Sequence, residues 1–139
     1  MKVTFFGHRD APGYLNENLY AMIEHLIVER NADTFYVGDH GNFDRMVLVT
    51  LEKIRRNYPN VKCCVVLSKM PSAQNHPGAL ETLFPEEVAI AHYKNAINKR
   101  NMWMLSHSDI VVTYVRRSYG GAARFRDIAI RQGKCIMDL

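Results

Sequence analysis

Hydrophobic residues follow two alternating periods along the chain, and the shorter period predicts β-strands. Each predicted strand is a short run rich in apolar or β-branched residues, bounded by polar or turn-forming residues. We expect five strands, at residues 2–6, 34–37, 61–67, 109–115 and 134–137. The run at 61–67 is almost continuously apolar, which is typical of a strand that is covered on both faces.

The longer period predicts amphipathic helices between these strands. Apolar residues recur three or four positions apart, so that they fall on one face of a helix. We expect four helices, at residues 15–27, 43–54, within 86–105 and at 122–132. Pro59 follows the second helix as a stop signal, and Gly133 is a typical C-terminal stop for the last.

This alternation predicts the fold class. Strands that alternate with helices form a mainly parallel sheet, and the helices cover both of its faces. The chain has 139 residues, which is the usual size of one domain. We therefore predict an α/β protein in which residues 1–139 form one Rossmann-like domain, with a sheet of about five strands.

Residues 68–85 interrupt the alternation. They contain three of the five prolines of the chain, at Pro71, Pro77 and Pro85. The sequence predicts a long loop here, and loops of this length inside a compact domain often have a function of their own.

Three polar, glycine-containing junctions each follow a predicted strand. They are Gly7-His8-Arg9, Gly38-Asp39-His40-Gly41-Asn42 and Tyr119-Gly120-Gly121-Ala122-Ala123-Arg124. Glycine permits sharp turns and close approach to the backbone, and a helix N-terminus attracts anions. In a parallel sheet, the ends of such strands form the ligand-binding crevice. The junctions therefore predict a site for a phosphate-bearing ligand such as a nucleotide.

Individual roles within this predicted site follow from side-chain chemistry. Backbone N–H groups at Gly120, Gly121 and Ala122 would hold phosphate, and Arg9 and Arg124 would neutralise its charge.

Other residues of the junctions would contact the rest of the ligand. His8 would donate or accept a hydrogen bond, and Tyr119 would stack on a base. Asp39 or Asn42 would bind ribose hydroxyls, although either residue is equally suited to cap the following helix.

Positive charge is concentrated near the C-terminus. The net charge is +4, and residues 116–134 contain six basic residues and one acidic residue. Such a cluster indicates a phosphorylated small ligand, a solvated helix face or a nucleic acid. No aromatic stacking pattern and no helix-turn-helix spacing accompany it, which argues against nucleic acid as the partner.

The composition also limits compartment and cofactor. Three cysteines, at Cys63, Cys64 and Cys135, do not make a disulfide framework, and they suit a reducing cytoplasm. No apolar run reaches the roughly 20 residues of a membrane span, and no signal peptide is recognised. No Cys/His spacing or acidic pair predicts a metal site, and no cofactor is indicated.

The motifs resemble those of a known superfamily when they are read in order. Four segments are similar to motifs of the SLOG superfamily. They are TFFGHRD at residues 4–10, GDHGNFD at 38–44, RNMWM at 100–104 and the stretch SDIVVTYV to YGGAARF ending at Phe125. That superfamily is the Rossmann-like group related to the Smf/DprA and LOG proteins. The closest likeness is to its small branch of bacterial and phage proteins that carry a GHR motif.

The resemblance implies a nucleotide-binding or nucleotide-sensing domain, with Arg100 and Asn101 in its ligand site. Related domains commonly pair, so the resemblance also implies a homodimer or a higher homo-oligomer. The LOG branch consists of phosphoribohydrolases with the signature PGGxGTxxE, which gives an alternative function: hydrolysis of the N-glycosidic bond of a nucleoside monophosphate. Laid over that signature, Gly120 and Gly121 match, and Asp127 stands where the catalytic glutamate would be.

Overall fold

The computed structural model describes residues 1–70 and 80–139, and its centre is one parallel sheet. Six strands are hydrogen-bonded in the order β4-β3-β2-β1-β5-β6, and every neighbouring pair is parallel. The strands are β1 (Lys2–Gly7), β2 (Thr34–Val37), β3 (Lys62–Val66), β4 (Glu81–Leu83), β5 (Ile110–Tyr114) and β6 (Cys135–Asp138). This arrangement confirms the predicted α/β class with a Rossmann-like parallel sheet.

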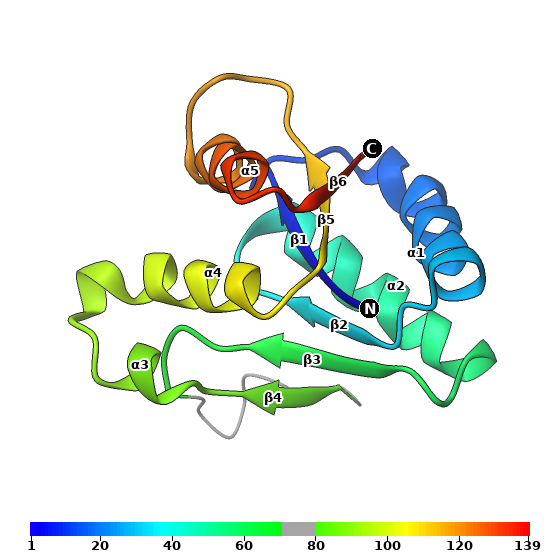
Figure 1. Cartoon of the computed structure of the whole chain (residues 1–139), viewed down its shortest axis with the longest axis horizontal. Coiled ribbons are helices and arrows are strands. Elements are labelled where there is room, and N and C mark those ends of the chain that lie inside the picture. The colour runs from blue at the N-terminus through cyan, green and yellow to red at the C-terminus, as the bar shows by residue number, and fades with distance from the viewer. Residues whose placement is uncertain (71–79) are drawn as a thin grey trace.

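Helices cover both faces of the sheet, as Figure 1 shows. The longer helices are α1 (Asn16–Arg30), α2 (Gly41–Asn57), α4 (Ala96–Ser106) and α5 (Gly121–Arg131), and shorter turns are α3 (Glu86–Ala89) and two 3₁₀ turns at Gly13–Leu15 and Tyr93–Asn95. Helices α1 and α2 pack on one face, and α4 and α5 pack on the other. In the described parts of the chain, none of the helices is long and apolar enough to cross a membrane.

Alternate strand residues supply two separate hydrophobic cores. Phe5 points toward α1 and α2, whereas its neighbour Phe6 points toward the opposite face and stacks on Phe125 of α5 at 5.4 Å between ring centroids. Cys63 and Cys64 are divided between the faces in the same way. Both sulfurs are buried and unbridged, and burial raises the pKa of the Cys63 thiol to about 12. This agrees with their interpretation as small core residues.

Two features differ from the sequence prediction. Residues 68–85 were predicted to be a loop, but Glu81–Leu83 form β4, a sixth strand at the edge of the sheet. The strand has only three residues, of which Glu81 and Thr82 are exposed and Leu83 is half-buried, so it carries no apolar run that the sequence could reveal. The rest of that predicted loop includes residues 71–79, which lie outside the described residues.

The second difference concerns residues 86–105, where one helix was predicted. The structure has α3, a break and then α4, because the chain leaves the helical conformation at His92 (φ −60°, ψ 140°). A 3₁₀ turn follows and leads into α4. The break places Lys94 and the first turn of α4 at the end of the sheet where the loops after the strands gather.

The strand order sets the position of the ligand-binding crevice. β1 is paired with β2 on one side and β5 on the other, and the chain leaves β1 toward α1 but leaves β5 toward α5. Because these two connections go to opposite faces, they separate at the C-terminal ends of β1 and β5. Such a switch in strand order leaves room for a ligand between the loops.

Gly7 is the position at which this strand end tolerates no side chain. A Cβ atom there would lie 2.2 Å from Cγ of Phe43, which is fully buried in α2. We expect Gly7→Ala to lower the free energy of unfolding by about 2 kcal/mol, because overpacking forces side chains and backbone apart. Denaturant unfolding measures this change. The matched control is Gly13→Ala, where a Cβ meets nothing within 4 Å; equal stability of the two variants would contradict the packing argument.

Candidate functional site

A cavity of about 480 Å³ lies at the C-terminal ends of β1 and β5. Loops after β1, β2 and β5, the first turns of α2 and α5, and the N-terminal half of α4 enclose it. Its lining residues are Phe5, Phe6, Gly7, His8, Arg9, His40, Asp44, Lys94, Ile97, Asn98, Arg100, Asn101, Met104, Arg117, Gly120, Gly121, Ala122 and Phe125. The cavity therefore coincides with the crevice that the glycine junctions predicted.

The N-terminus of α5 forms one wall of the cavity. Gly120 has φ 94° and ψ 174°, a conformation that is essentially restricted to glycine. A Cβ on Gly120 or Gly121 would meet no atom of the described structure within 4 Å, and none of the described side chains caps the helix. The helix therefore presents its first backbone N–H groups and the positive end of its dipole to open space.

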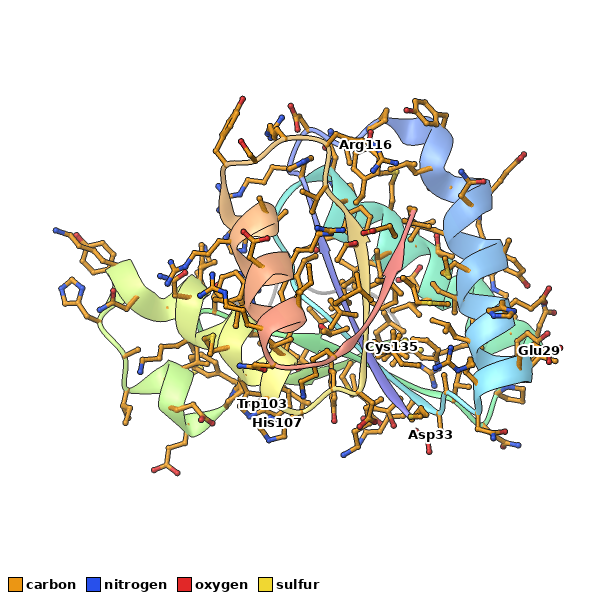
Figure 2. All side chains as sticks on the ribbon, turned by 45° about the horizontal axis from the view of Figure 1, so that its top comes forward. Glu29, Asp33, Trp103, His107, Arg116 and Cys135 are labelled. Carbon is orange, nitrogen blue, oxygen red and sulfur yellow. The ribbon has the colours of Figure 1, made fainter. Side chains whose placement is uncertain are left out.

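The loop before α5 is tied to the loop after β1. His8 is 5% exposed, and its Nε2 accepts a hydrogen bond of 2.8 Å from the backbone N–H of Arg116. Figure 2 labels Arg116 in this loop. Arg117 holds Asp10 through two hydrogen bonds of 3.0 Å. His8 was predicted as a ligand-binding residue; it does line the cavity, but its Nε2 is used to hold the loop.

Arg100 is the most deeply buried charged side chain of the described residues, with 2% exposure. Its Nη1 donates to Asp39 Oδ1 at 3.0 Å and to the carbonyl oxygen of Val66 at 3.1 Å. Its Nε donates to Asn101 Oδ1 at 2.9 Å. The guanidinium of α4 is thereby anchored to the ends of β2 and β3 at the floor of the cavity. Such anchoring is what a buried charge requires.

The loop after β2 supports this guanidinium. Asp39, predicted to read ribose, holds Arg100 and also lies 3.0 Å from Nδ1 of His40. Burial lowers the pKa of His40 below its ordinary value, and the nearby Arg100 charge lowers it further. Gly38 makes room for the group, because a Cβ there would lie 2.9 Å from Cζ of Arg100.

Asp44, in the first turns of α2, is a carboxyl group that lines the same cavity. Its Oδ2 accepts a hydrogen bond of 3.0 Å from the backbone N–H of His40. Desolvation raises the pKa of Asp44 to about 6, against the opposing effects of that hydrogen bond and of the Arg100 charge. The sequence analysis did not select Asp44, because its place in the cavity depends on how α2 packs against distant segments of the chain.

The loops after β1 and β2 touch directly. The backbone N–H of Asn42 donates to the carbonyl oxygen of Arg9 at 2.8 Å. Gly41 has φ 87°, and a Cβ there would lie 2.7 Å from Cα of Arg9, so this contact requires glycine. Asn42 itself is exposed. The second junction is therefore mainly a support for the first, and the side chain of Arg9 extends into the cavity lining.

The structure brings together most of the residues predicted for the site. Those that line the cavity are Gly7, His8, Arg9, Arg100, Asn101, Gly120, Gly121 and Ala122. Gly38, Asp39, Gly41 and Asn42 are not lining residues and belong to the supporting loop after β2.

Three further predicted residues lie outside the lining. Tyr119 is 69% exposed, with the Arg117 guanidinium 5.4 Å from its ring centroid. Arg124 donates to Asn98 Oδ1 at 3.3 Å across α5 and α4. Asp127, the predicted catalytic carboxylate, is exposed on α5 and is not a lining residue.

Several lining residues were missed by the sequence analysis. Lys94 and Asn98 lie just after the break that precedes α4, so a single predicted helix gave no reason to select them. Arg117 was counted only as part of the basic stretch. Together with Arg9 and Arg100, Lys94 and Arg117 make the cavity predominantly cationic.

The basic stretch at residues 116–134 is spread over different contacts. Arg116 donates to the carbonyl oxygen of Leu139 and lies 4.5 Å from the centroid of the Tyr114 ring. Arg126 pairs with Asp138 at 2.9 Å, and Lys134 donates to the carbonyl oxygen of Ser108 at 2.8 Å. Much of this charge therefore stabilises the end of the sheet, and Arg117 is the one basic residue of this stretch that lines the cavity.

The His8 contact predicts a pH dependence of stability. Burial, more than the charge of Arg117, lowers the pKa of His8 below its ordinary value of 6.5, so the folded protein favours neutral imidazole. This contribution is present above about pH 6.5 and is lost as the pH falls through the folded-state pKa. Between about pH 7.5 and 5.5, wild type should lose about 1 kcal/mol more unfolding free energy than His8→Gln, whose amide oxygen accepts the same bond at every pH. Equal losses in urea unfolding would refute this role.

Comparison with known proteins finds no matching family model and no matching curated protein. The geometry of the cavity therefore carries the functional argument.

Proposed function

We propose that the protein binds or senses a nucleotide or a nucleotide-derived ligand in the cavity at the ends of β1 and β5. The observation that carries this proposal is the open N-terminus of α5, which faces a cavity with four cationic side chains. Unused N–H groups at a helix N-terminus and nearby arginines are the groups that bind phosphate. Their position at the switch in strand order is where Rossmann-like sheets hold ligands.

Gly120, Gly121 and Ala122 would bind the phosphate through their backbone N–H groups. The absence of side chains at the two glycines allows a ligand to approach the backbone closely. Arg9, Lys94 and Arg117, which line the same cavity, would neutralise its charge. Arg124, in the first turn of α5, contacts Asn98 of α4 and would add positive potential at the rim of the cavity.

The remaining space suits a nucleoside. A volume of about 480 Å³ lies within the range of small-molecule sites. Phe6, Ile97 and Met104 supply apolar surface, and Asn98 and Asn101 supply amide groups that can select hydroxyl or ring nitrogen atoms. Because Asp39 is engaged with Arg100, these amides are better placed than Asp39 to recognise ribose.

The alternative functions have less support. Asp127 is exposed and lies outside the cavity lining, so its position does not support N-glycosidic hydrolysis through that residue. That activity stays a prediction. Little of the basic stretch is left to bind nucleic acid, because Arg116, Arg126 and Lys134 make contacts within the protein. The SLOG resemblance is consistent with the proposal, and the expected cytoplasmic location and homo-oligomer stay predictions.

Ligand binding should raise thermal stability. A ligand that binds only the folded state stabilises it by about 2.7 kcal/mol at 100 times its dissociation constant. We expect a thermal-shift screen of nucleoside monophosphates, triphosphates, NAD, ADP-ribose and cyclic dinucleotides to give at least one hit. Each hit is then incubated with the protein and assayed for released base. An intact hit supports binding or sensing, and a cleaved hit supports the hydrolase alternative.

The phosphate position is tested by Gly121→Asp. Its Cβ meets no atom and its φ is not positive, so the variant should fold while a carboxylate occupies the anion site. We expect binding of the screened hit to weaken at least tenfold by calorimetry. Gly13→Asp is the matched control, since Gly13 is equally open and lies outside the cavity lining. Wild-type affinity in a folded Gly121→Asp protein would disprove the phosphate site.

A further inference from the structure

Asp44 stands apart from the other groups of the cavity. The lining contains the cations Arg9, Lys94, Arg100 and Arg117, but Asp44 is its one carboxyl group among the described residues. An ionised carboxylate repels an anionic ligand and lowers its affinity. A site that is built for phosphate would therefore bind more tightly without Asp44, unless this carboxyl group contributes to binding in another form.

The hydrogen bonds of Asp44 leave one of its oxygens available. Oδ2 accepts the backbone N–H of His40, the residue just before α2, at 3.0 Å. Oδ1 receives no hydrogen bond from any described residue. Because the carboxyl group lines the cavity, a ligand that fills the cavity can reach this second oxygen.

Gly38 brings Asp44 close to the buried guanidinium. A Cβ on Gly38 would lie 2.8 Å from Oδ2 of Asp44 and 2.9 Å from Cζ of Arg100, so both groups crowd the same point. Yet the Arg100 ion pair is made with Asp39, at 3.0 Å. Asp44 is thus held near Arg100, whose Nη1 and Nε are used by Asp39, Val66 and Asn101 and whose Nη2 lies 3.5 Å from Nδ1 of His40.

The charged and titratable groups around Asp44 come from every neighbouring element. Arg9 faces it from the loop after β1, Arg100 from α4, and Asp39 and His40 from the loop after β2. Lys94 and Arg117 line the same cavity from the turn before α4 and the loop before α5. Desolvation outweighs the two arginines and raises the pKa of Asp44 to about 6, so both protonation states are accessible near neutral pH.

We propose that Asp44 is a ligand-binding residue that takes up one proton when an anionic ligand enters, so that the cavity binds an anion and a proton together. This inference rests on the proposed function. The proton comes from solvent and is held on Oδ1, from which the neutral carboxyl group donates a hydrogen bond to an oxygen of the ligand. The ligand class is therefore an anion with an acceptor oxygen near the floor of the cavity, such as a phosphoryl or carboxylate group.

The sign of the pH effect follows from linkage. If the protonated form binds better, affinity falls as the pH rises above the pKa of Asp44 in the unliganded protein. With that pKa at about 6, most of the effect lies between about pH 6 and pH 8. Burial lowers the pKa values of His8 and His40, so both are neutral in the unliganded protein over most of this range, and the Asp44→Asn variant distinguishes their protonation from that of Asp44.

We test this with two probes whose charge does not change between pH 6 and pH 8: inorganic sulfate and ADP-ribose. Wild type should bind the probe roughly 50-fold more weakly at pH 8 than at pH 6, because full protonation on binding starts from a pKa of about 6 in the unliganded protein. Asp44→Asn should bind with one affinity at both pH values, close to that of wild type at pH 6. Glu29→Gln removes a carboxylate from the outer side of α1, away from α5, and should keep the wild-type pH dependence (Figure 2).

A second measurement needs no variant. Calorimetry of wild type at pH 7 in two buffers of different ionisation enthalpy counts the protons taken up, and we expect close to one proton per bound ligand. The absence of proton uptake overturns the inference even if Asp44→Asn fails to fold.

The outcomes separate this inference from the proposed function. Binding with the same affinity at pH 6 and pH 8 and no proton uptake overturns the role of Asp44, while nucleotide binding stands. A pH dependence that persists in Asp44→Asn also overturns it. If neither probe binds at pH 6 and the nucleotide screen gives no hit, the proposed function fails and this inference fails with it.

Discussion

The arrangement of the cavity depends on one interaction, the anchoring of the Arg100 guanidinium among Asp39, the Val66 carbonyl and Asn101. A charge that is 2% exposed is tolerated only when several partners compensate for its lost hydration. By satisfying Arg100, the ends of β2 and β3 fix the position of α4, and α4 carries the wall of the cavity that faces α5. The same requirement explains why Gly38 has no side chain, since any Cβ would displace either this guanidinium or Asp44.

The strand order supplies the space, and the loops determine its chemistry. Connections from β1 and β5 leave toward opposite faces of the sheet, which opens the crevice between them (Figure 1). His8 and Asp10 then hold the loop that precedes α5 through the Arg116 backbone and the Arg117 guanidinium. As a result, an uncapped helix N-terminus lies in a cationic cavity, with Asp44 as the one acid that lines it among the described residues.

Much of this could be predicted from the sequence, because apolar periodicity and glycine act locally. The runs near residues 34–37 and 110–114 are buried strands, and the glycines at Gly120 and Gly121 do mark an open helix start. What the sequence did not predict depends on contacts between distant segments. β4 is a strand only because it pairs with β3, and the role of His8 requires the backbone of Arg116, which is 108 positions away. The exposure of Asp44 to the cavity likewise depends on the packing of α2 against its neighbours, which no local pattern encodes.

The most direct test of the central claim is a backbone amide NMR titration of the isotope-labelled protein with ADP-ribose. If the ligand lies in the cavity between β1 and β5, the largest shifts should appear at the amides of Gly120, Gly121 and Ala122, accompanied by the Nε–H signal of Arg100. The amides on the outer side of α1, around Glu29, should not move. Saturable shifts that are confined to α1 or to the basic residues near Lys134, with no change at Gly120 and Gly121, would contradict the assignment of this cavity as the nucleotide site.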